Sequence, residues 1–360
     1  MRITQVISDG NVGGAGILLS RITDALKDRF DFEILLPETS ALRARLPRNG
    51  VKITPFPFSA DRSFRMPDAL AFARYFRRTK PDIVHTHAAL SARVGGALAG
   101  VPVLLSTRHC AGAEVLGGLR TRLYNAVTTL TVSTAAAATR QLSAAGIAEG
   151  RIATVPNGSP ALARLPEDSR LRLRRALGFS DGAFVLGNCA RMEPVKGQDT
   201  LLRAMALLSP RYPDVRLLLV GDGSKRESLE TLTARLGLCR AVRFVGYTAA
   251  PDIYENLFDL HINPSRGTDT SSLVTSECMS LGIPTVASDF GGNPDMVEDG
   301  TSGLIFPRDN PAALAHAVEK ILDGRPFYEK LKAGAAAAWK NRFSLTRMAE
   351  DYTKIYASFS

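Results

Sequence analysis

The chain has 360 residues, of which 45% are hydrophobic and 22% are charged, and this balance excludes a disordered protein. Its length allows two domains of ordinary size, each with its own hydrophobic core. No apolar run approaches the roughly 18 residues that a membrane-spanning helix needs, and the formal net charge is +10.

The cysteine pattern and the amino-terminal residues indicate the cellular compartment of the protein. The cysteines are scattered, without the paired spacing of a zinc site or a disulfide framework, which fits a reducing cytosol. The first residues predict a strand followed by a glycine loop, because their apolar part is too short and too interrupted for a signal peptide. The four cysteines are Cys110, Cys189, Cys239 and Cys278.

Strands and helices alternate along the amino-terminal half. Short apolar runs predict strands, and longer stretches with apolar residues at helical spacing predict helices. We expect strands at Ile3–Ser8, Phe32–Leu36, Ile83–Thr86, Val103–Ser106, Leu130–Val132 and Ile152–Val155, and helices at Ile17–Arg29, Pro67–Arg78 and Thr134–Ala145.

A glycine-rich loop, Gly10–Gly16, follows the first expected strand and opens a helix. A loop of this kind can hold a dinucleotide. Its spacing does not match the G-x-G-x-x-G fingerprint, and Asp31 and Glu33 are poorly placed for a ribose contact. NAD binding is therefore kept only as an alternative.

Histidines lie near the ends of two neighbouring strands. His85 and His87 end one strand, and His109 follows the next. The His-x-His pair is half of a metal site, but no carboxylate or third histidine lies nearby in the sequence. We expect no metal here, and for His85 a structural role with satisfied hydrogen bonds.

The positive charge is concentrated in residues 1–160, which hold 20 Lys and Arg against 11 Asp and Glu, whereas the remainder holds 25 against 24. This asymmetry predicts an anionic partner, either nucleic acid or a membrane surface. Aromatic and basic residues are mixed over Phe56–Lys80, as in segments that lie on a bilayer. For the helix Asp68–Arg78 we favour the alternative of an ordinary amphipathic helix, and for the loop Phe56–Met66 we favour membrane contact.

The alternation of strands and helices restarts after residue 180. A restart predicts a second domain with its own parallel sheet, and the polar stretch Pro156–Arg175 carries the junction. Since ligands bind at the carboxyl ends of such strands, the loops that follow them can converge on one cleft. The expected strands are Phe184–Cys189, Val215–Val220, Val242–Val245, Leu260–Ile262 and Pro284–Ala287.

Two cations, Arg191 and Lys196, follow the strand Phe184–Cys189 in one short loop. Arginine offers a planar fork and lysine a point charge, so the pair is suited to a diphosphate. The alternative is two solvated loop charges, and this segment alone does not separate the two interpretations.

A second loop places carboxylates on both sides of a helix start. Asp269 precedes the polar turn Thr270–Ser272, in which Ser271 or Ser272 is a good N-cap, and Glu277 lies eight positions after Asp269 within the helix. The free N–H groups of residues 272–275 and the helix dipole favour a phosphate. A phosphate between two carboxylates predicts a nucleotide sugar, with hydroxyls at both ends.

Several segments have a recognisable order and spacing over about half of the chain. They are Arg191–Gly197, Leu218–Gly223, Phe244–Gly246, Asn263–Glu277, Ala287–Gly292 and Asp299–Gly303. In this combination they resemble the retaining family-4 glycosyltransferases (glycosyl transferases group 1) of the GT-B fold. That family has Glu where this chain has Asp269, which is one methylene shorter, and the difference bears on sugar choice.

The resemblance implies an α/β fold with two Rossmann-like domains facing each other across a cleft. Residues 1–160 are then an acceptor-binding domain, to which a last helix at 345–359 crosses back. Residues 176–340 are a nucleotide-sugar-binding domain.

The resemblance also implies the site residues. Arg191 and Lys196 stabilise the leaving diphosphate, Asp269 contacts the hexose, Glu277 contacts the ribose, and His109 lies near the donor sugar. These five are the implied catalytic residues. The implied substrate-binding residues are Gly13, Gly14, Gly16, His87, Gly221, Gly246, Tyr247, Thr270, Ser271, Ser272, Leu273 and Val274.

The implied reaction moves a hexose, with retention, from a UDP- or GDP-sugar to a glycan or lipid-linked acceptor. The departing phosphate oxygen accepts the proton of the acceptor. Two cations and a helix dipole already offset the charge, so we expect no cofactor and no metal ion. The implied setting is cell-surface polysaccharide, lipopolysaccharide or glycolipid assembly, in the cytoplasm, with peripheral attachment to an anionic membrane surface at the inner face of the plasma membrane.

Two other classes of function stay open from the sequence. One is an NAD-dependent oxidoreductase with two Rossmann domains, in which the Arg191–Lys196 loop would have no role. The other is a non-catalytic sugar- or nucleic-acid-binding protein. No stacking or groove-reading motif supports nucleic acid, so we expect none as a partner.

Overall fold

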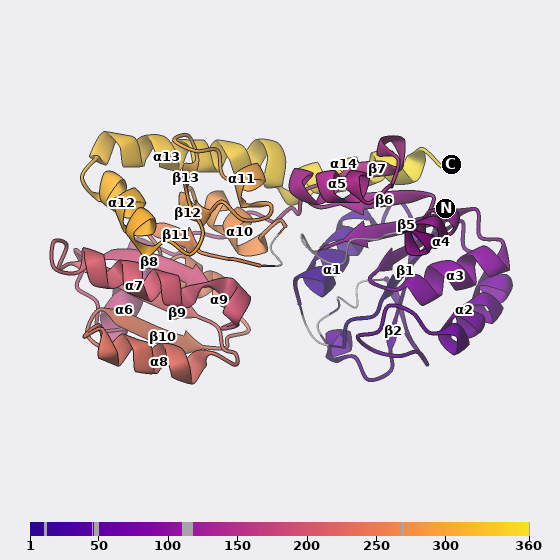
Figure 1. Cartoon of the computed structure of the whole chain (residues 1–360), viewed down its shortest axis with the longest axis horizontal. Coiled ribbons are helices and arrows are strands. Elements are labelled where there is room, and N and C mark those ends of the chain that lie inside the picture. Colours follow the sequence, from indigo (N-terminus) through magenta and orange to yellow (C-terminus); the bar gives the residue numbers. More distant parts are fainter. Residues whose placement is uncertain (11–12, 45, 47–49, 110–117, 268–269, 360) are drawn as a thin grey trace. The chain divides into compact units, whose positions relative to one another are not determined.

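The computed structural model describes residues 1–10, 13–44, 46, 50–109, 118–267 and 270–359. The chain divides into two compact units (Figure 1). The first unit is Met1–Gly158 together with Leu345–Ser360, and the second is Ser159–Ser344. Each unit is an α/β sandwich around a parallel sheet.

The first unit contains a seven-stranded parallel sheet with the order β3-β2-β1-β4-β5-β6-β7. Its strands are β1 (Arg2–Ile7), β2 (Asp31–Pro37), β3 (Lys52–Phe56), β4 (Ile83–His87), β5 (Val103–Arg108), β6 (Leu130–Ser133) and β7 (Ile152–Thr154). Its helices are α1 (Gly14–Leu26), α2 (Met66–Thr79), α3 (Leu90–Ala99), α4 (Leu119–Ala126), α5 (Ala136–Ala144) and α14 (Leu345–Ala357).

Alternate residues of the strands fill two cores, one on each face of this sheet. Ile3 and Ile7 of β1 pack with α1 and α14, whereas Val6 packs with α2 and α3. Helix α14 contributes Met348 and Tyr352 to the first of these cores. The polypeptide therefore returns from the second unit to complete the first.

The second unit contains a six-stranded parallel sheet with the order β10-β9-β8-β11-β12-β13. Its strands are β8 (Phe184–Cys189), β9 (Val215–Val220), β10 (Val242–Gly246), β11 (Leu260–Asn263), β12 (Thr285–Ser288) and β13 (Gly303–Phe306). Its helices are α6 (Glu167–Ala176), α7 (Gln198–Leu208), α8 (Arg226–Arg235), α9 (Pro251–Glu255), α10 (Leu273–Ser280), α11 (Asn293–Met296), α12 (Pro311–Leu322) and α13 (Arg325–Ala338).

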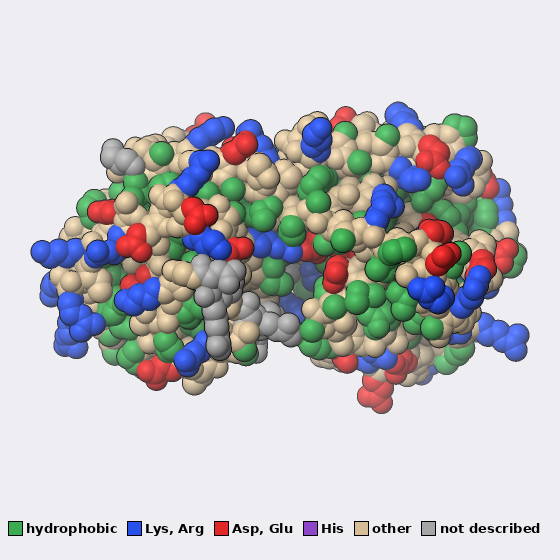
Figure 2. Space-filling view, turned by 180° about the vertical axis from the view of Figure 1, so that it is seen from behind, with side chains coloured by type: hydrophobic (Ala, Val, Ile, Leu, Met, Phe, Trp, Pro, Cys, Tyr) green, Lys and Arg blue, Asp and Glu red, His purple; other side chains and the backbone are tan. Residues whose placement is uncertain are grey.

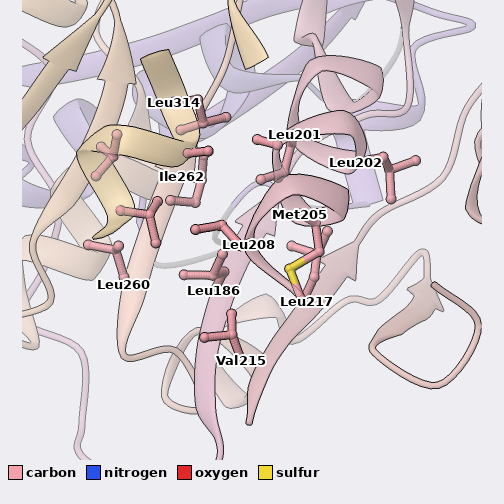
Figure 3. Packing of buried hydrophobic residues seen from close by; sticks show 14 of the residues in the cluster. Leu186, Leu201, Leu202, Met205, Leu208, Val215, Leu217, Leu260, Ile262 and Leu314 are labelled. Carbon is pink, nitrogen blue, oxygen red and sulfur yellow. The ribbon is translucent and has the colours of Figure 1, made fainter. Parts of the chain in front are cut away.

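Helix α7 anchors the largest core of the second unit. Figure 3 shows its Leu201, Met205 and Leu208 packed against Leu186 of β8 and Leu217 of β9. All five side chains are at most 1% exposed. Since α7 follows the loop with Arg191 and Lys196, this packing fixes the position of that loop on the sheet.

The strands expected from the sequence are confirmed, and two further strands were missed. β3 contains Pro55, which argues against a strand, but β3 lies at the edge of the sheet, where proline is tolerated. β13 is only four residues long and follows a turn. Both are edge strands, and short edge strands carry the weakest sequence signal.

The interpretation of residues 68–78 as an ordinary amphipathic helix is confirmed. Phe72, Tyr75 and Phe76 of α2 are buried with Phe56 in the core beneath this helix. The segment that leads into this helix differs, because Phe64 before it is 41% exposed and Met66, its first residue, is 53% exposed. Within the described residues, no helix combines the length and apolar character that crossing a membrane requires.

Replacing Leu208 with alanine should destabilise the second unit by about 3 kcal/mol, because it leaves a cavity beneath α7. Denaturant unfolding of the purified variant measures the change. Its neighbour Leu207 is 55% exposed on the same helix, so Leu207→Ala is the matched control and should stay within about 0.5 kcal/mol of the wild type. Equal effects from the two variants would contradict this packing.

Candidate functional site

The strand order of the second unit creates a switch point between β8 and β11. The chain runs outward through β9 and β10 on one side of β8, and then continues through β11 on the other side. The two loops that follow these central strands leave the sheet at its carboxyl edge beside the switch point, where ligands usually bind in such folds. One of these loops carries Arg191 and Lys196, and the other leads to α10.

Tight backbone packing holds the loop after β8 against the loop after β9. The N–H of Met192 donates to the carbonyl of Asp222 at 2.8 Å, and the N–H of Gly221 donates to the carbonyl of Gly246 at 2.8 Å. Gly221 has φ +123°, and a Cβ there would lie 2.1 Å from the carbonyl oxygen of Ala190. Only glycine fits this position, so Gly221 has a structural role, and its contact with a ligand stays a prediction.

The loop after β8 also contacts the loop after β11. Gly197 ends the short 3₁₀ turn that contains Lys196, has φ +69°, and lies so close to the carbonyl of Pro264 that a Cβ would be 2.1 Å from its oxygen. The N–H of Arg266 donates to the carbonyl of Val195 at 2.8 Å. The guanidinium of Arg266 also pairs with Asp199 in the first turn of α7. The two loops are therefore one packed unit.

Helix α10 begins where the sequence predicts, but it offers a ligand fewer backbone N–H donors than expected. Ser272 is the N-cap, and its hydroxyl accepts a hydrogen bond from the N–H of Thr275 at 3.2 Å. The N–H of Ser272 itself contacts the sulfur of Met296 at 3.1 Å. The expectation of four available N–H groups at residues 272–275 is therefore wrong, because two of them are used internally. Leu273 and Val274 provide the other two.

Of the two predicted carboxylates, one lies within the described residues. Glu277 is half-buried on α10 and belongs to the charges that raise the pKa of the Cys189 thiol, after burial and Glu255. Since Cys189 ends β8, Glu277 lies on the same edge of the sheet as the Arg191 loop. Asp269 lies outside the described residues, as does Cys110.

The other predicted residues of this unit occupy the same edge. Arg191 is exposed, and its carbonyl accepts a hydrogen bond from the amide of Gln198 at 3.0 Å. Gly246 has φ +87° at the end of β10, and the following Tyr247 is 70% exposed. Thr270 and Ser271 are buried.

Some supporting residues had not been predicted. The Glu193 carboxylate accepts hydrogen bonds from the N–H and the hydroxyl of Ser224, which ties two of the loops together. The Asn263 amide donates to Asn293 at 3.0 Å beneath the loop after β11. A polar residue at the end of an apolar strand, such as Asn263, is the signal that could have found this support.

In the first unit the histidines form a buried cluster at the switch point between β1 and β4. His85 and His87 lie on the face of the sheet that α14 covers, next to Gln5 of the neighbouring β1. His87 Nδ1 is 2.8 Å from His109 Nε2, and the two rings stack with centroids 5.1 Å apart. The predicted site residues His87 and His109 are therefore in contact.

All three imidazoles are neutral at pH 7. Burial, with His109 and Arg93 nearby, lowers the pKa of His85 to about 3. Burial and the other two histidines hold the pKa of His87 well below its usual range. Burial and the Arg108 guanidinium lower the pKa of His109 to about 4. The structural role expected for His85 is confirmed, because both of its ring nitrogens have partners at 2.7 and 2.8 Å.

The glycine loop of the first unit is described only in part. Gly13 is the N-cap of α1, and a Cβ at Gly13 or Gly14 would meet open space. At Gly16 a Cβ would lie 2.6 Å from Leu42, so this glycine permits close packing. Glu33, considered above for a ribose contact, is instead bound by Tyr75, Thr54 and Lys52. It is a structural residue.

The described residues contain no group of three or more His, Cys, Asp or Glu side chains that could hold a metal ion. In the histidine cluster, both ring nitrogens of His87 are already hydrogen-bonded, one to His109 and the other to Gln5. Its arrangement is that of a hydrogen-bonded network.

Comparison with known families covers nearly the whole chain. The family described as Glycosyl transferases group 1 matches residues 169–338, and Glycosyltransferase Family 4 matches residues 12–160. The chain belongs to the group 1 glycosyltransferases. Both units thus have their counterpart in this family, and the dinucleotide-binding alternative is set aside.

Relatives of known name are also glycosyltransferases. A D-inositol 3-phosphate glycosyltransferase of Streptomyces scabiei is 30% identical over 286 residues, which is 71% of this chain and 63% of that protein. The alpha-D-kanosaminyltransferase of Streptomyces kanamyceticus is 32% identical over 53% of this chain and 49% of its own length. The chain thus spans about half to two thirds of the length of these relatives.

Solved structures show the GT-B fold. HepE from Anabaena, solved with UDP, superposes with a TM-score of 0.87 at 22% identity, covering 99% of this chain and 100% of that one. Sucrose-phosphate synthase from Thermosynechococcus elongatus superposes with a TM-score of 0.80 at 21% identity, covering 99% of each chain. This glycosyltransferase therefore has two Rossmann-like domains, as the sequence predicts.

The neutral histidines predict a loss of stability in mild acid. An unfolded histidine has a pKa of about 6.5, so below that pH the unfolded chain binds protons that the folded cluster does not. Stability is complete above about pH 6.5 and falls as the pH drops toward 4, by about 1.4 kcal/mol per pH unit for each such histidine. Calorimetric melting between pH 8 and pH 5 measures this slope.

The control is a histidine that faces water. His316 on α12 is exposed, so His316→Gln should leave the acid slope unchanged, whereas His87→Gln should flatten it. A slope that is the same in all three proteins would contradict the assignment of the neutral cluster.

Proposed function

We propose that the protein transfers a hexose, with retention of configuration, from a UDP-linked donor to a glycan or lipid-linked acceptor. The observation that carries this is the packed pair of loops at the β8–β11 switch point, of which the first carries Arg191 and Lys196 and the second leads to α10. HepE, which has the same fold, has been solved with UDP and with UDP-glucose. A GDP-linked donor is the alternative.

Each group at this edge has a role in the proposal. Arg191 and Lys196 hold the diphosphate, as a fork and a point charge. The N–H groups of Leu273 and Val274 add two donors and the positive end of the helix dipole. Glu277, one turn into α10, accepts hydrogen bonds from the ribose hydroxyls. Asp269, outside the described residues, is assigned to the hexose.

In the proposed mechanism, the bond between the anomeric carbon and the diphosphate breaks, and the leaving oxygen becomes negatively charged. That oxygen takes the proton of the acceptor hydroxyl as the hydroxyl oxygen attacks the same face of the sugar. Catalysis is then mostly positioning and stabilisation of the leaving group. Removal of one such donor typically lowers the rate on the order of 10²–10³-fold.

We further propose that the reaction needs no metal ion. Two cations and a helix N-terminus offset the charge of the leaving diphosphate, which is the task that Mg²⁺ performs in other phosphate enzymes. Unchanged transfer in the presence of EDTA supports this part of the proposal.

We also propose that the first unit attaches to an anionic membrane surface. Phe64, Met66 and Leu70 are each more than 40% exposed, and the exposed Arg62 and Arg74 lie on the same loop and helix. Met66, Leu70 and Arg74 follow each other at four-residue spacing, so they share one face of α2. Figure 2 shows that basic and hydrophobic side chains are also interspersed over the face of the molecule opposite to that seen in Figure 1. Cell-surface glycan or glycolipid assembly, on the cytoplasmic side, is the setting that fits such a surface.

Lys196→Ala and Arg191→Ala should each lower turnover at least tenfold, because each removes a cation from the leaving diphosphate. The measurement is a thermal-shift screen of the wild type with UDP, GDP, ADP and NAD, followed by kinetics with the nucleotide that stabilises it. Arg240 precedes β10 at the opposite edge of the sheet, so Arg240→Ala is the control and should keep normal turnover.

Two outcomes would overturn the proposed function. One is stabilisation of the wild type by NAD and by no nucleoside diphosphate. The other is normal turnover in well-folded Lys196→Ala and Arg191→Ala variants.

Arg62→Ser with Arg74→Ser should weaken sedimentation with anionic vesicles, most visibly at low salt, since each basic residue near such a surface contributes about 1 kcal/mol. Phe64→Ser with Leu70→Ser should weaken it at all salt concentrations, since apolar insertion is not screened. Arg235 and Arg240 are exposed in the second unit, and replacing both with serine is the charge-matched control. Wild-type protein that stays in the supernatant at low salt would contradict membrane attachment.

A further inference from the structure

The second unit contains a partly enclosed cavity of about 430 Å³, which lies within the usual size range of small-molecule sites. Its walls are the residues that lead into β8, β11 and β12, together with α6, the end of α12 and α13. These strands are parallel, so the residues that lead into them gather at the amino edge of the sheet. The cavity is therefore separate from the loop with Arg191 and Lys196, which lies at the opposite, carboxyl edge.

Basic side chains outnumber acidic ones in this cavity. The cations that line it are Arg164, Arg170, Arg174, Arg325 and Lys332, and the carboxylates that line it are Glu167 and Asp259. A third carboxylate, Glu329, pairs with Arg325 at 2.9 Å and with Lys332 at 3.0 Å. Two positive charges remain in excess among these groups, although residues 161–360 as a whole hold 25 Lys and Arg against 24 Asp and Glu.

The inner cations hold the buried carboxylate of Asp259. Its two oxygens accept hydrogen bonds from Arg170 at 2.5 Å and from Arg174 at 2.7 Å. The N–H of Val185 in β8 donates to the same carboxylate at 2.8 Å. Further N–H groups of Arg174 donate to the Leu257 carbonyl, so this guanidinium is committed to the protein. Because the charge of Asp259 is offset by two guanidinium groups, it does not oppose the binding of an anion.

Arg164 and Lys332 are the cations best placed for a ligand. Among the described residues, the Arg164 side chain donates only to the Leu281 carbonyl, and it has no carboxylate partner. A Cβ at Gly282 would lie 3.5 Å from Arg164 Nη2 and 3.7 Å from the Lys332 carbonyl oxygen, so the guanidinium lies beside α13. The Lys332 side chain is 38% exposed and shares Glu329 with Arg325.

The charge and the walls of the cavity indicate the class of ligand. A phosphate monoester carries about −1.5 to −2 charges at pH 7, which matches the excess of positive charge. A guanidinium fork and an ammonium are the side chains that suit its oxygens. Apolar side chains, among them Phe184, Ile283 and Leu322, line other parts of the cavity. An inorganic ion would leave these walls and most of the volume unused, so the phosphate should carry an organic group.

We propose that this cavity is a binding site for a small organic phosphate monoester, whose phosphate is held by Arg164 and Lys332. The site is distinct from the proposed donor site and does not depend on the proposed function. It touches the amino ends of β8 and β11, the two strands whose carboxyl ends lead to the candidate site. A sugar phosphate and a nucleoside monophosphate share the required chemistry.

Isothermal titration calorimetry at low salt tests the site, with glucose 6-phosphate and uridine 5′-monophosphate as the two arms. Inorganic phosphate, glucose and uridine are the reference probes. We expect saturable binding of one of the two esters, binding of inorganic phosphate that is about tenfold weaker or more, and no binding of the neutral sugar or nucleoside. Added salt should weaken the binding of the ester, because charges dominate the contact.

Arg164→Gln with Lys332→Gln removes both cations and should weaken the binding of the ester about tenfold or more, since each charged hydrogen bond contributes to affinity. Arg172 on α6 and Lys330 on α13 are exposed and lie outside the cavity, so Arg172→Gln with Lys330→Gln is the charge-matched control. The control should bind as the wild type does. If the double variant does not fold, Lys332→Gln alone replaces it, because this side chain is partly exposed.

Arg191→Ala with Lys196→Ala locates the binding within the second unit. We expect this protein to bind the ester as the wild type does, because these two cations lie at the other edge of the sheet. Binding that is lost here and kept in Arg164→Gln with Lys332→Gln would assign the ester to the donor site and overturn the inference.

Three other results would also overturn the inference. They are the absence of saturable binding for both esters, equal affinity for an ester and inorganic phosphate, and equal losses in the double variant and its charge-matched control. The proposed function fails separately, when neither UDP nor GDP stabilises the protein, and binding of the ester at the cavity would still be measured in that case.

Discussion

The close approach of two backbones at Gly197 and Pro264 is the constraint on which the candidate phosphate site depends. A side chain at Gly197 would collide with the Pro264 carbonyl, and the left-handed backbone of Gly197 turns the chain from the Lys196 loop into α7. Because α7 is fixed on the sheet by its buried leucines, the lysine loop cannot move away from the loop after β11. The cations and the start of α10 are therefore held at one edge before any ligand arrives, which lowers the entropy that binding must overcome.

The two units use the same architecture with different chemistry at their switch points. In the second unit, the loop that follows β8 carries the cations Arg191 and Lys196, a chemistry that suits a phosphate. In the first unit, the switch point beside β1 holds the neutral rings of the histidine cluster and the Gln5 amide. Neutral hydrogen-bonding groups can orient a hydroxyl without attracting a phosphate.

Much of the fold could be predicted from the sequence, for physical reasons that differ between elements. The central strands were predictable because both of their faces are buried and their apolar runs are continuous, as in Val215–Val220. The strands β3 and β13 were not, since β3 contains Pro55 and β13 is only four residues long. The N-cap at Ser272 follows from local chemistry, but the contact of its N–H with Met296 depends on tertiary packing and has no local signal. Gln5 and Tyr356 lie far apart in the sequence, so the hydrogen bond between them could not be predicted without the fold.

Helix α14 has a consequence for the way in which the protein is made. Ribosomes deliver the strands of the first sheet and α1 early, yet the part of one sheet face that α14 covers stays exposed until α14 emerges, after the entire second unit. During this interval the polar groups of β1 and β4 lack the tyrosine that will bond them, and Ile3 and Ile7 lack part of their core. The first unit therefore reaches its final structure only after translation has passed the second. A chain that stops short of α14 would keep an exposed apolar face that chaperones and proteases recognise.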